Sequence, residues 1–356
     1  MQVVSNYEFT KVSRIDAGDG KNSVGVWLAD DPALGGQVAV KEIAKADFRD
    51  PDEYFSEARK MFASDHPNVV SIRLGAQTAD SIYLVMPYYK NGSLAARVRS
   101  GPLPVQAALK ITREVLAGAG AIHAGRSVHL DIKPTNVLFG QRGEALVADF
   151  GQARTMRPGG FAPLPDRLYI PHIPPECWAG NVAGVQADIF QIGLTLYRCL
   201  NGDDEFFRQL HAIPSQADLQ AAIANGDFPK RDVYLPHISL SLRKAVNKAL
   251  NPDMDKRFQS AFDFSNALAQ VTVKHNWHPV RSPDGEIQWT AERRSRPDLV
   301  AMLTQDSSAP PRWSVEWFTS RAGKRRRTMP NMCRNGVSRT DAMRHLRQSF
   351  QTLERA

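Results

Sequence analysis

The sequence predicts an α+β protein with a strand-rich first part, a helix-rich second part and a small α/β module at its C-terminal end. Two changes along the chain indicate this. Alternating, β-rich runs dominate up to about residue 88, and apolar residues at helical spacing dominate after it. Of 45 basic and 37 acidic residues, residues 271–356 hold 16 and 8, which leaves 29 of each before them. The net charge of +8 therefore lies in the C-terminal module.

Length and composition limit the class of protein. At 356 residues the chain is long enough for one large core with an appendage, or for two to three domains. Its three cysteines are widely spaced and odd in number, which excludes a disulfide framework or a zinc spacing and favours a reducing compartment. The sequence has no apolar run of signal-peptide or membrane-span length. We therefore expect a soluble, cytoplasmic protein that does not contact a membrane.

The first part is expected to form a sheet with one helix. A Pro/Gly turn, "DPALGG", separates the first two β-rich runs. The segment 50–63 has helical spacing, acidic residues in its first turn and a stop at "DHPN". The expected strands are residues 23–30, 37–44, 71–77 and 81–89.

The second part is expected to be mainly helical. Apolar residues recur at intervals of three and four in three long segments. The expected helices are residues 103–125, 187–202 and 241–251.

The C-terminal module contains two segments that resemble each other. Residues 295–305 and 338–348 share Ser, Arg, Asp, Leu and Gln at the same offsets, and each follows a tryptophan, Trp277 or Trp313. Ser before Asp is a helix N-terminal signal, and the second segment continues with an apolar stripe at helical spacing. The pattern predicts two strand-strand-helix repeats, with a helix in each segment.

Several short motifs then occur in one order along the chain, and together they carry more weight than any one of them. Singly, each is weak, because a lone lysine at a strand edge or a lone aspartate in a turn is common. They are Lys41 in "VAVK", Glu57, "HLDIKPTN" at 129–136, "DFG" at 149–151, "PPE" ending at Glu176, Asp188 and Arg257.

This ordered set resembles a eukaryotic-type (Hanks-type) serine/threonine protein kinase domain, from about residue 7 to 270. The resemblance implies the two-lobed protein kinase fold in residues 1–272, with a strand-rich N-lobe up to about residue 87 and a helical C-lobe over about 88–272. Residues 273–356 lie beyond it as a basic C-terminal module. Together with the short segment between "DFG" and "PPE", the compact module favours a bacterial or phage source.

The resemblance also implies the chemistry and the cofactors, ATP and Mg²⁺. Phosphoryl transfer needs the phosphates held, their charge neutralised and the attacking hydroxyl aligned. The implied catalytic residues are Asp131, Lys133, Lys41 and Glu57, and the implied metal ligands are Asn136 and Asp149. The implied ATP-binding residues are Gly18, Gly20, Ser23, Val26, Ala39, Lys41, Met86, Pro87, Tyr89 and Leu138.

Three positions depart from the family pattern or bear on its subtype. Ser23 stands where the phosphate-covering loop usually has its third glycine, which leaves the strength of ATP binding open but removes no charged group. Leu130 replaces the arginine that pairs with a phosphorylated activation loop, so we expect activity that does not depend on phosphorylation there. Tyr169 stands where serine/threonine kinases keep a threonine, whereas Lys133, two residues after Asp131, is typical of them.

The leading hypothesis is an Mg-ATP-dependent kinase that acts on protein hydroxyls, including its own, with a targeting or regulatory module. The alternative is a pseudokinase scaffold, whose irregular glycine loop no longer binds ATP productively. Residues 324–327, "KRRR", could track phosphates and nearby aromatics could stack bases, so a nucleic-acid or protein partner that regulates the kinase is a further alternative. Such basic runs are more often part of a solvated hairpin. A kinase of small molecules ranks below these.

Overall fold

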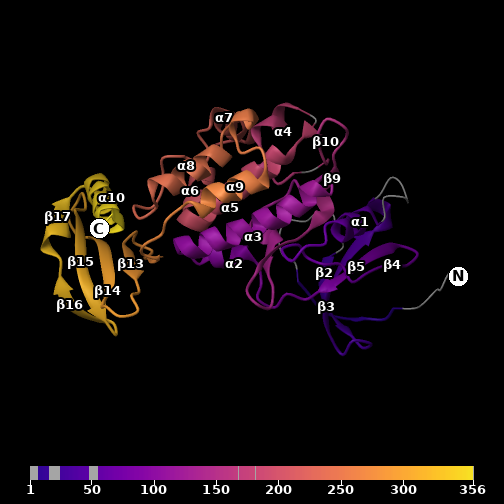
Figure 1. The fold of residues 1–356 in the computed structure, drawn as a ribbon, viewed down its shortest axis with the longest axis horizontal. Helices are drawn as coiled ribbons and strands as arrows, with labels where there is room; N and C mark the ends of the chain where they lie inside the picture. The colour runs from indigo at the N-terminus through magenta and orange to yellow at the C-terminus, as the bar shows by residue number, and fades with distance from the viewer. Residues whose placement is uncertain (1–6, 16–24, 48–54, 167, 181, 356) are drawn as a thin grey trace. The chain divides into compact units, whose positions relative to one another are not determined.

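The structure is a computed structural model that describes residues 7–15, 25–47, 55–166, 168–180 and 182–355. The chain divides into two compact units. Figure 1 shows the fold as a ribbon. Unit 1 is Met1–Ala96, Arg113–Ile192 and Asp253–Ser265, and unit 2 is Arg97–Thr112, Gly193–Pro252 and Asn266–Ala356. The boundary expected after residue 272 does not separate the units, because the C-terminal module belongs to the same unit as residues 193–252.

The first part of unit 1 is a five-stranded antiparallel sheet with one helix. The sheet and the helix were predicted, but the strand β1 was not among the four expected strands. Its strand order is β1-β2-β3-β5-β4. The helix is α1 (Ser56–Ala63), and the predicted start of that helix, residues 50–54, lies outside the described residues. The strands are β1 (Thr10–Arg14), β2 (Gly25–Asp31), β3 (Gly36–Ala44), β4 (Leu74–Gln77) and β5 (Ser81–Pro87).

Alternation along β3 decides which side chains meet α1. Successive strand residues point to opposite faces, so Val38 and Val40 pack on one face with Ala29 and Val85. Ile43 lies on the other face, in a cluster to which Ala58 of α1 contributes. Lys41 is two residues before Ile43 and therefore projects toward the α1 side of the sheet.

The rest of unit 1 consists of short paired strands between helices. The pairs are β6–β9, β7–β8 and β10–β11, and they bracket the loops that carry the predicted motifs. The helices are α3 (Val105–Ala124), α4 (Pro175–Ala179), α5 (Val185–Asn201) and α9 (Ala261–Ala269), of which α3, α5 and α9 continue into unit 2. The strands are β6 (Ser127–Val128), β7 (Val137–Phe139), β8 (Ala145–Val147), β9 (Arg154–Thr155), β10 (Ala162–Pro163) and β11 (Val182–Ala183).

The helical part of unit 2 begins with ordinary capping chemistry. Ser215 and Ser239 each accept a backbone N–H three residues ahead and so start α7 and α8. The three helices expected at residues 103–125, 187–202 and 241–251 are present as α3, α5 and α8, which confirms that prediction. The helices of this part are α6 (Asp203–His211), α7 (Gln216–Asn225) and α8 (Leu240–Ala249). The short helix α2 (Leu94–Arg99) begins in unit 1 and ends in unit 2.

The C-terminal module is an antiparallel sheet with one long helix. The strand order is β12-β13-β14-β15-β16, and β17 also pairs with β15. Phe350 of α10 (Arg339–Arg355) packs against Trp277, Trp289 and Trp317 of the sheet. The strands are β12 (Trp277–Arg281), β13 (Ile287–Ala291), β14 (Asp298–Gln305), β15 (Trp313–Arg321), β16 (Lys324–Thr328) and β17 (Arg334–Val337).

The predicted helix at 295–305 is wrong, and with it the two strand-strand-helix repeats. Residues 298–305 of that segment form the central strand β14, paired on both sides. Leu299, Val300, Ala301 and Leu303 are all buried, on both faces of a strand that pairs with β13 and β15. Pro297, just before the strand, also favours an extended Arg296. The predicted second helix, at 338–348, is confirmed as α10.

In the part of the chain that the structure describes, no helix has the length and apolar character needed to cross a membrane.

Candidate active site

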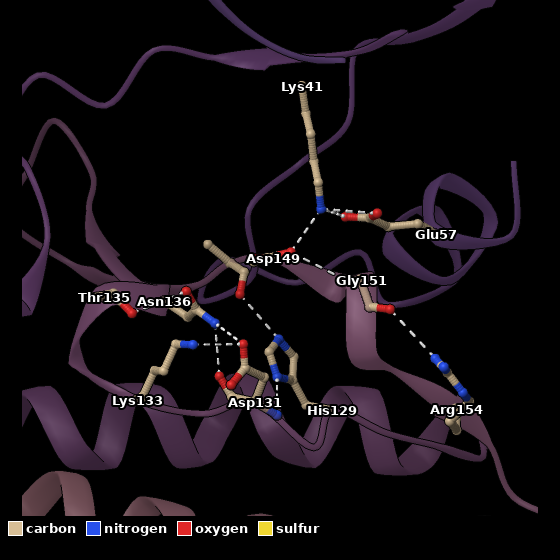
Figure 2. Close-up of polar contacts among 11 residues, drawn as sticks. Lys41, Glu57, His129, Asp131, Lys133, Thr135, Asn136, Asp149, Gly151 and Arg154 are labelled. Atoms are coloured by element: carbon tan, nitrogen blue, oxygen red, sulfur yellow. Dashed lines mark hydrogen bonds and ion pairs between the residues drawn. The ribbon is translucent and has the colours of Figure 1, made fainter. Parts of the chain in front are cut away.

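Lys41 of β3 holds its ammonium between two carboxylates from different parts of the chain (Figure 2). Its Nζ lies 2.8 Å from Glu57 Oε1, 3.1 Å from Glu57 Oε2 and 2.8 Å from Asp149 Oδ1. Burial alone would lower the pKa of Lys41, but the two carboxylates raise it above its ordinary value. The lysine therefore stays charged at any physiological pH.

The two carboxylates around Lys41 differ in their surroundings. Burial raises the pKa of Glu57 above its ordinary value, against the effect of Lys41. Desolvation would likewise raise the pKa of Asp149, but the Lys41 ammonium holds it well below its usual range. The Asp149 side chain is 43% exposed, so this carboxylate is both ionised and open to a ligand.

Asp131 and its two neighbours form a second cluster in the loop between β6 and β7 (Figure 2). Lys133 Nζ lies 3.1 Å from Asp131 Oδ2, and Asn136 Nδ2 donates to the same oxygen at 2.8 Å. Asn136 Nδ2 also donates to the Asp131 carbonyl at 2.9 Å, which closes the loop. Asp131 Oδ1 is buried and has no hydrogen-bond partner among the described residues. One carboxylate oxygen is therefore held and the other is left for a donor.

Burial raises the pKa of Asp131 to about 6, although Lys133 pulls it down. A carboxylate with this pKa is ionised at neutral pH and is a better proton acceptor than an exposed aspartate. An unpaired oxygen on such a group is suited to orient a hydroxyl and take up its proton.

The backbone of this loop is fixed by one buried aspartate of α5. Asp188 Oδ2 accepts from His129 N at 2.9 Å and Oδ1 from Leu130 N at 2.8 Å. His123 Nε2 lies 2.7 Å from Asp188 Oδ2. Leu130 has φ of 64°, a left-handed conformation that costs energy for a branched side chain and needs such support.

Sequence reasoning identified Asp188 but missed other polar residues that hold the loop. Gln191 Oε1 accepts from Ile132 N at 2.8 Å, and its Nε2 donates to Leu130 O at 2.9 Å. His172 Nδ1 lies 3.1 Å from Ile132 O. The available signal was a polar side chain inside an apolar helical run, as for Gln191 in "IFQIG" and His123 in "AIHAG", because such a side chain needs a buried partner.

Asn136 and Asp149 fit a magnesium ion that takes most of its ligands from phosphates and water rather than from the protein. Among the described residues, no group of three or more His, Cys, Asp or Glu side chains could enclose a metal. Asn136 and Asp149 lie on segments joined by a hydrogen bond from Ala148 N to Asn136 O, at 2.9 Å. Mg²⁺ is commonly held by one or two protein oxygens with phosphates and water, which is what this pair offers.

Several of the residues expected to bind ATP lie on adjacent strands of the first sheet. Val26 pairs with Lys41, and Ala39 pairs with Met86. Met86 packs in the cluster on the α1 side. Pro87 ends β5, Tyr89 follows it, and Leu138 lies in β7. The predicted Gly18, Gly20 and Ser23 lie outside the described residues.

Leu130, which stands where the family keeps arginine, is part of an apolar cluster. It is 1% exposed and packs with buried residues of α4, β10, β11 and α5. Five members of the cluster come from the segment between Asp149 and Glu176, namely Met156, Ala162, Leu164, Leu168 and Ile173. That segment is therefore anchored to the loop by hydrophobic packing.

The same segment brings an aromatic ring to the Asp131 cluster. Lys133 Nζ lies over the Tyr169 ring, 4.4 Å from its centroid, while its ion pair with Asp131 is intact. A cation–π contact of this kind fixes the ammonium from a second side.

Glu176 and Arg257, two members of the ordered motif set, form an ion pair. Arg257 Nη1 and Nη2 donate to Glu176 Oε1 and Oε2 at 2.8 and 2.7 Å, a bidentate geometry. Arg257 also donates to Gln186 O at 2.9 Å and lies over the Phe190 ring at 4.8 Å. The arginine side chain is fully buried.

Comparison with known proteins agrees with this geometry. The family model described as "Protein kinase domain" matches residues 13–278. The chain is 29% identical over 259 residues to the serine/threonine-protein kinase PrkC of Bacillus subtilis, covering 71% of this chain and 39% of the relative. It is 30% identical over 261 residues to the serine/threonine-protein kinase pkn2 of Myxococcus xanthus, covering 68% and 30%.

The likeness extends beyond bacteria. The chain is 31% identical over 287 residues to calcium-dependent protein kinase 8 of Arabidopsis thaliana, covering 77% of this chain and 51% of the relative. The chain thus spans between about a third and a half of the length of these relatives. The family match ends at residue 278, so the strands from β13 onward and α10 lie outside it.

Proposed function

Because this chain belongs to the protein kinase domain family, we propose that it transfers the γ-phosphate of Mg-ATP to serine or threonine hydroxyls of proteins, its own included. The observation that carries the proposal is the position of the Lys41 ammonium, which contacts the carboxylates of Glu57 and Asp149 at the same time. None of the charged groups that the reaction needs is missing from the sequence. A pseudokinase would be expected to have lost at least one of them.

We assign each residue the role that the family resemblance implies and that its surroundings support. When bound, Mg-ATP supplies the phosphorus that is attacked and its leaving group. Lys41 would hold the α- and β-phosphates, and Asn136 and Asp149 would provide the protein oxygens for the metal. Asp131 Oδ1, which is unpaired among the described residues, would align the acceptor hydroxyl and take its proton. Lys133 would neutralise charge that develops on the transferring group.

The proposed activity does not depend on phosphorylation of the segment between Asp149 and Glu176. In the family, an arginine before the catalytic aspartate pairs with a phosphate on that segment. Here the buried Leu130 packs with five apolar residues of the same segment. Burial of one leucine side chain is worth roughly 1.5–3 kcal/mol, comparable with a charge-assisted pair, and needs no modification.

The family match ends at residue 278, and we assign the C-terminal module, residues 273–356, a targeting or regulatory role. The support is their charge, since the excess of basic over acidic residues lies there while the preceding residues are balanced.

The experiment that tests the activity is transfer of labelled phosphate from ATP with Mg²⁺, with and without a general protein acceptor. Asp131→Asn and Asp149→Asn should each reduce the rate by at least about a hundredfold, because each removes a charge used in the transition state. Asp80→Asn, at an exposed turn, is the matched control and should retain the wild-type rate. Equal transfer by all four proteins would refute the proposal.

A second arm tests independence from phosphorylation. Protein dephosphorylated by a phosphatase, which is then removed, should show its full initial rate without a lag. A lag that disappears as the protein labels itself would contradict this part of the proposal. Absence of transfer with a melting temperature raised by ATP would favour the pseudokinase.

A further inference from the structure

One edge of the C-terminal sheet carries a concentration of positive charge that the phosphotransfer site does not use. β16 and β17 both pair with β15, β16 along Phe318–Arg321 and β17 along Trp313–Val315, so together they line its outer edge. β15 has nine residues, which makes this edge about 30 Å long. From residue 317 to 340 the sequence holds seven basic residues and no acidic residue.

The charges on this edge point to solvent. All five residues of β16 are exposed, and so are Arg321 before it and Arg334 in β17. Arg325 is the one residue of Lys324–Arg327 with an ion pair among the residues that the structure describes, to Glu316 at 2.9 Å. Four adjacent cations on one strand repel each other, so an anionic partner would relieve a cost that the isolated sheet bears.

The same edge offers a flat surface beside the cations. The Arg325 guanidinium lies over the Phe318 ring, 4.6 Å from its centroid, and about half of the Arg325 side chain is exposed. Guanidinium planes and aromatic rings are the groups on which proteins stack unpaired bases. Three of the four residues Lys324–Arg327 are arginine, whose planar fork matches a phosphate with two hydrogen bonds.

We propose that the edge formed by β16 and β17 binds single-stranded nucleic acid, with Lys324, Arg326 and Arg327 contacting phosphates and Arg325 on Phe318 stacking a base. RNA and DNA share the chemistry that this edge recognises. An acidic peptide would satisfy the charges but would leave the stacking surface unused. In a duplex the bases are paired and stacked on each other, so they could not stack on that surface.

The test is fluorescence anisotropy with the full chain and a labelled 20-nucleotide single strand, as RNA and as DNA, beside the duplex of the same sequence and polyglutamate. We expect the RNA or DNA single strand to bind more tightly than the duplex and polyglutamate at 0.1 M salt. The difference between the RNA and DNA arms identifies the natural ligand. Tighter binding of the duplex, or equal binding of polyglutamate, would overturn the proposal, as would no binding of either single strand.

Arg326→Gln/Arg327→Gln should weaken single-strand binding by about tenfold and reduce the slope of log K against log salt by about 1.4, since each phosphate contact contributes about 0.7 for a single strand. The matched control is Lys244→Gln/Lys274→Gln, which removes two exposed cations from the same unit and should leave both values unchanged. Equal loss in the two variants would indicate general attraction by net charge and would refute the assigned edge. Asp149→Asn should bind as the wild type does, which keeps this test independent of the proposed phosphotransfer.

Discussion

At the scale of single residues, Asp131 shows how one environment gives two oxygens different roles. Lys133 and Asn136 hold Oδ2, and the buried Oδ1 is left without a partner among the described residues. The same burial moves the pKa of the carboxyl upward to about 6. Proton affinity and geometry therefore both favour this group as the acceptor of a hydroxyl proton.

The raised pKa of Asp131 leads to a prediction for the pH dependence of the reaction. A carboxyl with a pKa of about 6 is protonated below that pH and can no longer accept a proton. Activity, measured as kcat/KM, should therefore fall as the pH is lowered, with a midpoint near 6, because kcat/KM reports the free enzyme. Melting temperatures over the same range would separate this loss from unfolding. A midpoint near 4, the value of an ordinary aspartate, would contradict the assignment.

Sequence motifs single out the candidate site residues more readily than they show what surrounds each residue. Lys41, Glu57, Asp131 and Asn136 could be matched one by one, because each motif fixes its residues by short spacing. Leu130 could be recognised only as a missing arginine, since apart from Val128 the other members of its apolar cluster come from residues 156–187, and no short-range pattern connects them to it. Likewise, the contact of Tyr169 with Lys133 joins residues 36 positions apart.

At the scale of elements, α4 is held by an ion pair from a distant turn. The five-residue helix is too short to be stable alone. Arg257, which follows a 3₁₀ turn, provides its Glu176 with a bidentate partner. The element therefore depends on a buried contact rather than on its own helix propensity.

Arg257→Ala should lower the free energy of unfolding by about 3–5 kcal/mol, because it leaves Glu176 without its partner and opens the space over Phe190. The matched control is the neighbouring Lys256→Ala. Its ion pair with Asp253 is exposed, at 71% and 45% of the two side chains, so the loss should stay below about 1 kcal/mol. Urea denaturation of both variants measures the difference, and equal stabilities would refute a structural role for the buried pair.

The prediction of secondary structure failed in a segment whose apolar residues fit both the helical and the strand period. Residues 298–305 contain apolar side chains that satisfy both a helical and an alternating pattern. Pairing with β13 and β15 selects the strand, and that pairing is set by residues up to about 20 positions away. By contrast, α3 and α5 are long and strongly periodic, and their predicted existence is confirmed.

At the scale of the whole molecule, the C-terminal module shares its unit with part of the kinase domain. Trp289 Nε1 donates to His237 Nδ1 at 3.0 Å, and Arg347 Nη2 donates to Tyr234 O at 3.1 Å. Burial lowers the pKa of His237 to about 3, so this imidazole stays neutral and can accept the indole proton. Neither the charge asymmetry nor the end of the family match indicates this sharing, because both follow position along the chain.

Phe350→Ala should destabilise unit 2 by about 3–5 kcal/mol, because it leaves a cavity among three buried tryptophans. The control is Phe262→Ala, a side chain that is 72% exposed, with an expected change below about 0.5 kcal/mol. Tryptophan fluorescence during guanidinium unfolding reports on the affected site directly. An unchanged midpoint for Phe350→Ala would show that α10 does not help to hold the sheet together.

The strand order of the C-terminal sheet has a consequence for self-association. A sheet edge is a template on which a second copy can add a strand, and stacked copies aggregate. β12, one edge strand, contains Pro279, which has no N–H to offer to an incoming strand. At the other edge, β16 meets any second copy with four like charges. The two edge strands are thus protected by different means. If Lys324–Arg327 were replaced by neutral residues, β16 could pair with a second copy of the chain, and a concentrated protein solution would then form fibres.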